Sequence, residues 1–586
     1  MKKIPIFFFL IFSVTVVLSQ NQYAEKIDIF FKKAEANNFS GNVLVVHEGK
    51  IILHNGYGWK DKEAKIKEDG NSVFDIGSIT KQFTGAAILK LEMMGKLNTG
   101  DLLSKYFPEI PDDKKNITLH HLLTHSAGFP GAIGDDFEQI SAEDFIKRAF
   151  SEPLLFPPGE MYEYSNVGFS ILGILVEKLS GKTYEQFLHD EIFVPAGMLQ
   201  TGYIIPQFKT NTLSVGYTAD GERWGTMSER FNGISPGWHL KANGGILSTL
   251  DDLYNWSLAL EGDKILNNAA KEKYFTPHIK EYPDGDTYYG YGWVVMDSPD
   301  GKMIWHNGGN GISLSTFMGF NQQTKTCVIV NVNIGGKISD DYALKTYDIL
   351  RGINEVPDPV LAKDYTGKYT LENNAAVSVQ FDEFDRLIIQ FNSKEAFDVL
   401  LTDGSETREF VSKYNEKTSK MLNGLFAGNY DLIATAWDTP SEEFANGPGR
   451  MWEETAAENG GFSNVEILGS ASRRQMNAYI TLAKINFKEY SVYMMYVWRG
   501  ENLADARELQ QPDKIFEWEN NAVFSASNNN KKVILENGDL KVISEMGVVV
   551  ARKIDNLQFK TNAVARCFSP ATDSGGKCTI WKLRYH

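Results

Sequence analysis

Residues 74–94 read FDIGSITKQFTGAAILKLEMM, and they place a serine and a lysine at the start of an expected helix. Apolar residues recur at helical spacing from Thr80 to Met94. Ser78 and Lys81 are three residues apart, so their side chains share one helix face. A serine hydroxyl becomes an effective nucleophile when a neighbouring base, here a lysine amine, accepts its proton. The segment therefore predicts Ser78 as a nucleophile and Lys81 as its base.

The second motif is Tyr164-Ser165-Asn166, which follows the turn-forming residues FPPGE at 156–160. We expect it on a loop that leads into a helix over 165–180. A phenol beside a lysine ammonium loses its proton more readily, and it can then move protons between nucleophile and leaving group. Asn166 offers both a donor and an acceptor to a substrate amide. Tyr164 is thus a candidate catalytic residue, and Asn166 is a candidate substrate-binding residue.

The third motif is His306-Asn307-Gly308, which continues into Gly309. Glycines let a backbone edge approach a substrate closely, so residues 306–308 are candidates for substrate binding. The N–H groups of Ser78 and Gly309 are candidates for an oxyanion hole, where each lost donor costs roughly 3–4 kcal/mol. The three motifs together favour an acyl-transferring serine hydrolase.

With further segments, these motifs resemble one family. The matching segments are FSGNVLV at 39–45, LLTHSAG at 122–128, PAGMLQT at 195–201 and GGILSTLDDL at 244–253. The chain resembles the serine β-lactamase and penicillin-binding superfamily over about residues 25–350, in particular its branch of class C β-lactamases and D-alanyl-D-alanine carboxypeptidases. This resemblance implies that Ser78 is acylated, that Lys81 and Tyr164 are general bases, that Asn166 holds the substrate, and that His306, Asn307 and Gly308 pair with the substrate backbone.

The resemblance also implies a fold, which the sequence pattern supports. We expect an α+β fold (an α/β sandwich), in which helices cover an antiparallel sheet. Strand-like runs flank Glu48-Gly49-Lys50 and recur at 288–296, 302–306, 312–320 and 325–333, so one sheet is expected to form from both ends of the domain. Helical patterns lie between them, at 116–124, 141–151 and 165–180, and Ser248-Thr-Leu-Asp251 reads as a capping box before another helix. No metal or organic cofactor is implied, and the expected partner is a small-molecule or peptide substrate.

One position departs from the family pattern. Many β-lactamases carry a lysine where this chain has His306. A lysine is charged at pH 7 and can hold a ligand carboxylate, whereas histidine is mostly neutral at its unperturbed pKa of about 6.5. This difference disfavours an efficient β-lactamase but not penicillin binding. A β-lactam, a D-amino-acid peptide and an ester all remain open as substrates.

At 586 residues, the chain is long enough for several domains. A catalytic domain is expected over 20–355, and the sequence NEVPDPV near 352–362 reads as a linker. Beyond it we expect a β-rich segment over 356–404, a small α+β unit, faintly similar to NTF2-like folds, over 405–510, and a second β-rich segment over 511–586. The β-rich segments are interpreted as one β-domain that the α+β unit interrupts or follows.

The N-terminus predicts export. Lys2 and Lys3 precede an almost wholly apolar run over 4–18, so residues 1–19 read as a cleaved signal peptide. This run is short for a membrane span of about 20 residues, so no stable membrane anchor is expected. We therefore expect a periplasmic or secreted protein. The net charge of −16 disfavours nucleic acid as a partner.

Three cysteines occur. Cys327 lies in an apolar run and is expected to be buried, whereas a pairing of Cys567 with Cys578 stays open. A different class of function also stays open: a non-catalytic or slowly deacylating penicillin-binding or sensor protein. The sequence does not indicate an oligomeric state.

Overall fold

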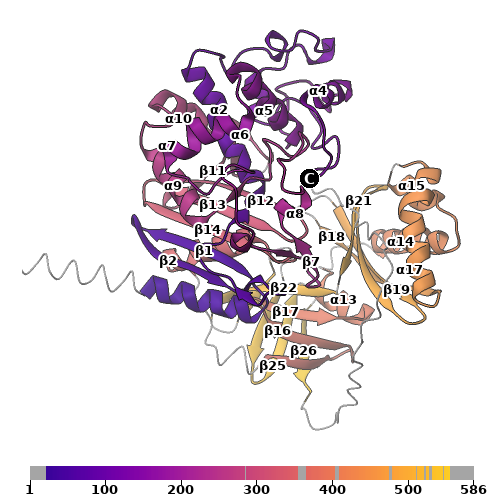
Figure 1. The fold of residues 1–586 in the computed structure, drawn as a ribbon. Coiled ribbons are helices and arrows are strands. Elements are labelled where there is room, and N and C mark those ends of the chain that lie inside the picture. Colours follow the sequence, from indigo (N-terminus) through magenta and orange to yellow (C-terminus); the bar gives the residue numbers. More distant parts are fainter. Residues whose placement is uncertain are drawn as a thin grey trace, which may run out of the picture. The chain divides into compact units, whose positions relative to one another are not determined.

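The computed structural model describes residues 22–554, apart from 284, 354–364, 403–407, 438, 474–477, 510, 521–522, 527–530 and 545–546. The described residues form two compact units, the first of which ends at Ile353 (Figure 1). The expected signal peptide at 1–19, most of the expected linker, and both Cys567 and Cys578 lie outside the described residues.

The first unit contains one eight-stranded antiparallel sheet, in the order β2-β1-β14-β13-β12-β11-β10-β9. Strand β1 pairs with β14 from Gly41 opposite Val332 to Val46 opposite Cys327. The prediction that both ends of this unit join in one sheet is therefore confirmed. The strands are β1 (Gly41–His47), β2 (Lys50–Tyr57), β9 (Ile279–Lys280), β10 (Thr287–Tyr289), β11 (Val294–Ser298), β12 (Gly301–Gly309), β13 (Ser315–Asn321) and β14 (Thr326–Val332).

Helices cover both faces of this sheet. Leu44 and Val46 of β1 belong to the core that the central helices form, and the alternating Val43 and Val45 are also fully buried. Cys327 of β14 is buried and free, as expected for a strand residue. The helices of this unit include one over residues 22–36, α2 (Thr80–Met93), α3 (Leu119–Leu123), α4 (Ala142–Ser151), α5 (Asn166–Ser180), α6 (Tyr184–Leu188), α9 (Leu250–Glu261), α10 (Asn268–Phe275) and α11 (Ser339–Arg351).

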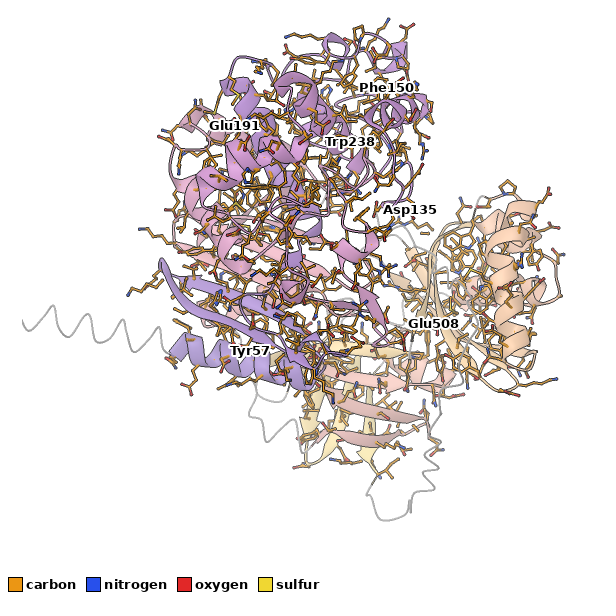
Figure 2. The ribbon with its side chains drawn as sticks, in the orientation of Figure 1. Tyr57, Asp135, Phe150, Glu191, Trp238 and Glu508 are labelled. Carbon is orange, nitrogen blue, oxygen red and sulfur yellow. The ribbon has the colours of Figure 1, made fainter. Side chains whose placement is uncertain are left out.

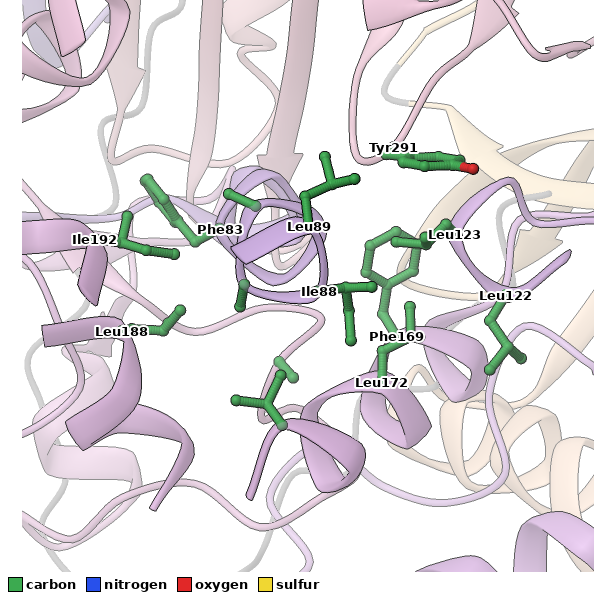
Figure 3. Packing of buried hydrophobic residues seen from close by; sticks show 14 of the residues in the cluster. Phe83, Ile88, Leu89, Leu122, Leu123, Phe169, Leu172, Leu188, Ile192 and Tyr291 are labelled. Atoms are coloured by element: carbon green, nitrogen blue, oxygen red, sulfur yellow. The ribbon is translucent and has the colours of Figure 1, made fainter. Parts of the chain in front are cut away.

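Helix α2 lies at the centre of the apolar core. Figure 3 shows Phe83, Ile88 and Leu89 of α2 between Leu188 and Ile192 on one side and a group of apolar side chains that includes Phe169 and Leu172 of α5 on the other. Phe83 is fully buried, and its ring lies 5.1 Å from that of Trp256 in α9. This surrounding core fixes the position of the residues that precede α2 and that form its first turn.

Two local predictions need correction. The strand expected over 288–296 is split into β10 and β11, because the chain turns at Gly292, whose φ is +90°. Helix α9 is capped by Thr249, whose hydroxyl accepts from the Asp252 N–H at 3.2 Å. Ser248, the expected cap, lies in the short strand β8 (Leu247–Ser248), so the cap lies one residue further along the chain.

The second unit contains a closed barrel. Its strands are β15 (Gly367–Leu371), β16 (Ala376–Phe381), β17 (Leu387–Phe391), β22 (Asp513–Asn520), β23 (Val523–Ser525), β24 (Lys532–Glu536), β25 (Asp539–Ser544) and β26 (Gly547–Lys553). The pairing of β17 with β22 joins the two β-rich segments that the sequence separated. Between them in sequence lie helices including α14 (Arg408–Phe426) and a four-stranded sheet of β18 (Phe462–Arg473), β19 (Ala478–Phe487), β20 (Ser491–Arg499) and β21 (Asn502–Leu509).

In the part of the chain that the structure describes, no helix combines the length and the apolar character that crossing a membrane requires.

Replacing Phe83 by alanine is expected to destabilise the first unit by about 3–5 kcal/mol, because the core cannot collapse fully around the lost ring. Urea unfolding, followed by tryptophan fluorescence and by amide hydrogen exchange in α2, measures this change. Leu258→Ala on α9 is the matched control, since that side chain is 43% exposed. Equal unfolding midpoints for the two variants would contradict the central position of α2 in the core.

Candidate active site

Ser78 lies in a tight turn, the 3₁₀ segment η1 (Gly77–Ile79), which leads directly into α2. Gly77 has a φ of +49°, and a Cβ on it would lie 2.2 Å from the N atom of Gly309. Its N–H donates to Asp75 Oδ1 at 2.9 Å. Only a residue without a side chain fits here, because the turn passes directly against strand β12. Ser78, the candidate nucleophile, thus lies where helix and sheet meet.

Lys81 lies below Ser78 and is fully buried. Its Nζ lies 3.1 Å from Ser78 Oγ and donates to the Asn243 carbonyl oxygen at 2.8 Å. Burial lowers the pKa of Lys81 well below its ordinary value, because the charged ammonium loses its hydration. A neutral amine in hydrogen-bond reach of the hydroxyl is suited to accept its proton.

Tyr164 lies beside both Lys81 and Ser78. Lys81 Nζ lies 4.7 Å from the centre of the Tyr164 ring, and the phenol shares a hydrogen bond with the Ser78 side chain. Burial raises the pKa of Tyr164, while the hydrogen bond to Ser78 opposes this rise. The direction is opposite to the sequence-based expectation of a more acidic phenol, because burial disfavours the phenolate as it disfavours the ammonium. The arrangement fits Lys81 as the base and Tyr164 as a proton donor.

His125, which the sequence motifs did not single out for the site, packs against Tyr164. Its ring centre lies 4.3 Å from that of Tyr164, and its Nδ1 accepts from the Ser165 N–H at 3.0 Å. The buried imidazole therefore holds the loop that carries the phenol. His125 belongs to the segment LLTHSAG, which the sequence analysis matched to the family, but only the fold shows that its ring packs against Tyr164.

Asn166 is the first residue of α5. Its N–H donates to the Gly131 carbonyl oxygen at 2.9 Å, which fixes the backbone. Its Oδ1 is buried and has no hydrogen-bond partner among the described residues. An acceptor left in this state costs free energy unless a ligand supplies a donor, so this amide is suited to bind substrate.

The His306 ring is engaged inside the protein. It is buried, with Nδ1 2.5 Å from the carbonyl oxygen of Asn307 and Nε2 2.9 Å from the hydroxyl of Tyr289. Because a carbonyl only accepts, Nδ1 carries the proton and Nε2 accepts from Tyr289. Burial, with a contribution from Lys81, lowers the pKa of His306 to about 3. The imidazole is therefore neutral, as the sequence suggested, and presents no charge to a ligand.

The backbone of residues 306–309 in β12, rather than the His306 side chain, is available for pairing with a substrate. Within the described residues, β11 pairs with β12 only as far as Trp305, so residues 306–309 extend beyond it on that side. The exposed Asn307 side chain donates to Asp340 Oδ1 at 2.7 Å. A Cβ on Gly308 would lie 2.5 Å from the Ser78 N atom. The Ser78 turn and the backbone of Gly308 and Gly309 are therefore in close contact, and the N–H groups of Ser78 and Gly309 stay candidates for an oxyanion hole.

A small pocket of about 70 Å³ opens beside these groups, and Ser78, Asn166 and Gly309 line it. Sequence reasoning missed its other lining residues, because loops distant in sequence supply most of them. These are Asp75, Gly77, Asp136, Phe137, Trp224, Met227, Leu240, Asn243, Gly244, Gly245, Asn310 and Ile312. Among the described residues, no group of three or more His, Cys, Asp or Glu side chains is placed to hold a metal ion.

Comparison with known proteins identifies the family. Residues 30–352 match the family model named Beta-lactamase. This matched range is more than half of the chain. The chain therefore belongs to the beta-lactamase family, the family of serine β-lactamases and penicillin-binding proteins. This agrees with the resemblance of the motifs.

Two proteins illustrate how far the similarity extends. A penicillin-binding protein of Bacillus subtilis strain 168 is 27% identical over 426 residues, which are 67% of this chain and 92% of that protein. The structure of an octameric penicillin-binding protein homologue from Pyrococcus abyssi matches 90% of this chain and 99% of its own, with a TM-score of 0.54 and 20% identity. The second likeness shows the fold, including the β-rich C-terminal part.

Adding a methyl group at Gly308 is expected to lower kcat/KM at least about 100-fold, because a 1 Å misplacement of a reacting group has that effect. The new Cβ would displace the Ser78 turn from β12. Hydrolysis of a 4-nitrophenyl ester measures the loss. Gly131→Ala is the matched control, since a Cβ there would meet only the Tyr164 carbonyl oxygen, at 3.5 Å. If Gly308→Ala retains full activity, the contact between strand and nucleophile is not required.

The pH dependence of acylation should report on the Lys81 amine. The base acts only when neutral, so the rate should rise with pH, with a midpoint below the ordinary lysine pKa of 10.5 because burial lowers it. Lys81→Arg should abolish this rise and cost at least about 100-fold in rate, since a guanidinium stays protonated. Stopped-flow acylation across pH measures both. Lys90→Arg, at the far end of α2, serves as control, and an unchanged profile for Lys81→Arg would exclude Lys81 as the base.

Proposed function

We propose that the protein is an exported serine hydrolase that forms an acyl-enzyme on Ser78 and hydrolyses amide or ester bonds. The reaction type would be that of class C β-lactamases, DD-peptidases and related esterases. The observation that carries this proposal is the buried Lys81 amine 3.1 Å from the Ser78 hydroxyl, with a pKa that burial lowers well below its ordinary value. Export rests on the apolar segment at 4–18 and its preceding lysines.

In the acylation step, Ser78 Oγ attacks the substrate carbonyl carbon while Lys81 takes the hydroxyl proton. The N–H groups of Ser78 and Gly309 bind the developing oxyanion. When the tetrahedral intermediate collapses, the C–N or C–O bond breaks and the leaving group takes the Tyr164 proton. Lys81 then returns its proton to the phenolate. Water repeats the sequence on the acyl-enzyme and releases the acid and Ser78.

Substitution of Ser78 by alanine is expected to abolish labelling by a fluorophosphonate and by a fluorescent penicillin. Labelling is followed in gels, and intact-mass spectrometry locates the added acyl group. Ser151→Ala, at the exposed end of α4, is the control and should label normally. Undiminished labelling of the Ser78→Ala protein would refute the proposal.

Turnover assays rank the possible substrates. A chromogenic cephalosporin, a 4-nitrophenyl ester and a peptide ending in D-Ala-D-Ala would be compared under the same conditions. An acyl-enzyme that forms but does not turn over on any of them would favour the slowly deacylating penicillin-binding alternative.

A further inference from the structure

The pocket beside Ser78 carries acidic but no basic side chains. Of the described residues that line it, Asp75 and Asp136 are carboxylic acids, and none is lysine, arginine or histidine. Behind the lining residues, Lys81 and His306 both have lowered pKa values because they are buried. The guanidinium of Arg230 lies 4.5 Å from the ring centre of Trp224 and donates to its carbonyl oxygen, but Arg230 does not line the pocket. No basic side chain therefore lines the pocket to hold a ligand carboxylate.

The two carboxyl groups have different surroundings. Asp75 is buried and accepts from the Gly77 N–H at 2.9 Å, and burial raises its pKa to about 6. Asp75 therefore holds the backbone of the turn that carries Ser78. Asp136 lies on the loop between α3 and α4 and is only partly buried. It lines the same pocket as Ser78, and its charge opposes the lowering of the Lys81 pKa that burial causes.

The remaining residues that line the pocket indicate which other chemical groups a bound ligand would carry. Phe137, Trp224, Met227, Leu240 and Ile312 supply apolar surface. On the side of Ser78, the buried Oδ1 of Asn166 has no partner among the described residues and calls for an N–H donor from a ligand. An apolar body that carries N–H groups and positive charge complements all these features.

We propose that Asp136 is a specificity-determining residue, which makes this pocket prefer acyl groups with an ammonium beside the scissile carbonyl over acyl groups with a carboxylate there. The substrate class is that of esters or amides of amino acids with a free amine. This inference rests on the proposed function of Ser78. It disfavours β-lactams and peptides with a C-terminal carboxylate next to the reacting bond.

Three 4-nitrophenyl esters that differ in one substituent test the inference: alanyl (in both configurations), isobutyryl and methylmalonyl. They place an ammonium, a methyl group or a carboxylate on the same carbon. With uncatalysed hydrolysis subtracted, kcat/KM should be highest for an alanyl ester and lowest for the methylmalonyl ester. Asp136→Asn should lower the alanyl-to-methylmalonyl ratio at least about tenfold, the effect of one charge contact of moderate strength.

Asp135→Asn is the matched control, since this neighbouring carboxylate, labelled in Figure 2, is exposed and does not line the pocket. Its ratio should equal that of the unmodified protein, and Asp136→Glu should restore most of the preference. A measurement on the unmodified protein needs no variant: the alanyl preference should weaken as NaCl rises, because salt screens the attraction.

The outcomes separate the two proposals. An alanyl-to-methylmalonyl ratio that Asp136→Asn leaves unchanged, or a preference for the methylmalonyl ester, overturns the role of Asp136 while Ser78 can still be the nucleophile. A ratio insensitive to salt also overturns it. Failure to hydrolyse any of the three esters, together with failure of Ser78 to label, overturns both proposals.

Discussion

The burial of one amine beside one hydroxyl is the constraint on which the first unit depends. Burial of the Lys81 amine, which donates to one backbone carbonyl oxygen, disfavours its ammonium form and lowers its pKa well below the ordinary value. This requires α2 to be enclosed by other helices, as Figure 3 shows for Phe83, Ile88 and Leu89. The core that stabilises α2 is therefore also what lowers the pKa of its lysine.

Much of the fold could be predicted, because its signals are local. The helical spacing after Thr80 and the alternation around Glu48-Gly49 reflect the side-chain periods of helices and strands. The joining of β1 to β14 followed from strands at both ends of the unit, and the pairing confirms it. The split at Gly292 was missed, because a positive φ in a strand-like run leaves no mark in the hydrophobic pattern. The pairing of β17 with β22 agrees with a β-domain that the α+β unit interrupts, but the closure of that domain into a barrel involves segments too distant in sequence for any local signal.

The candidate site was predictable where spacing along one helix determines it, as for Ser78 and Lys81. The pKa values of the site residues could not be predicted, because they depend on burial. The pKa of Tyr164 is raised, whereas the sequence led us to expect a lowered one. Asp136 and Asn243 could not be found either. Each reaches the pocket from a loop, and only the packing of the whole unit shows that these loops converge.

The pairing of β17 with β22 has a consequence for how the chain is made. Gln390 lies opposite Asp513, with the whole stretch 394–509 between them. During synthesis, β15 to β17 leave the ribosome long before β22, which pairs with β17 in the barrel. The edge of β17 therefore stays unpaired until β22 has been made. The intervening α14 and β18–β21 have apolar contacts of their own, which would let them collapse early and bring the two distant strands within reach.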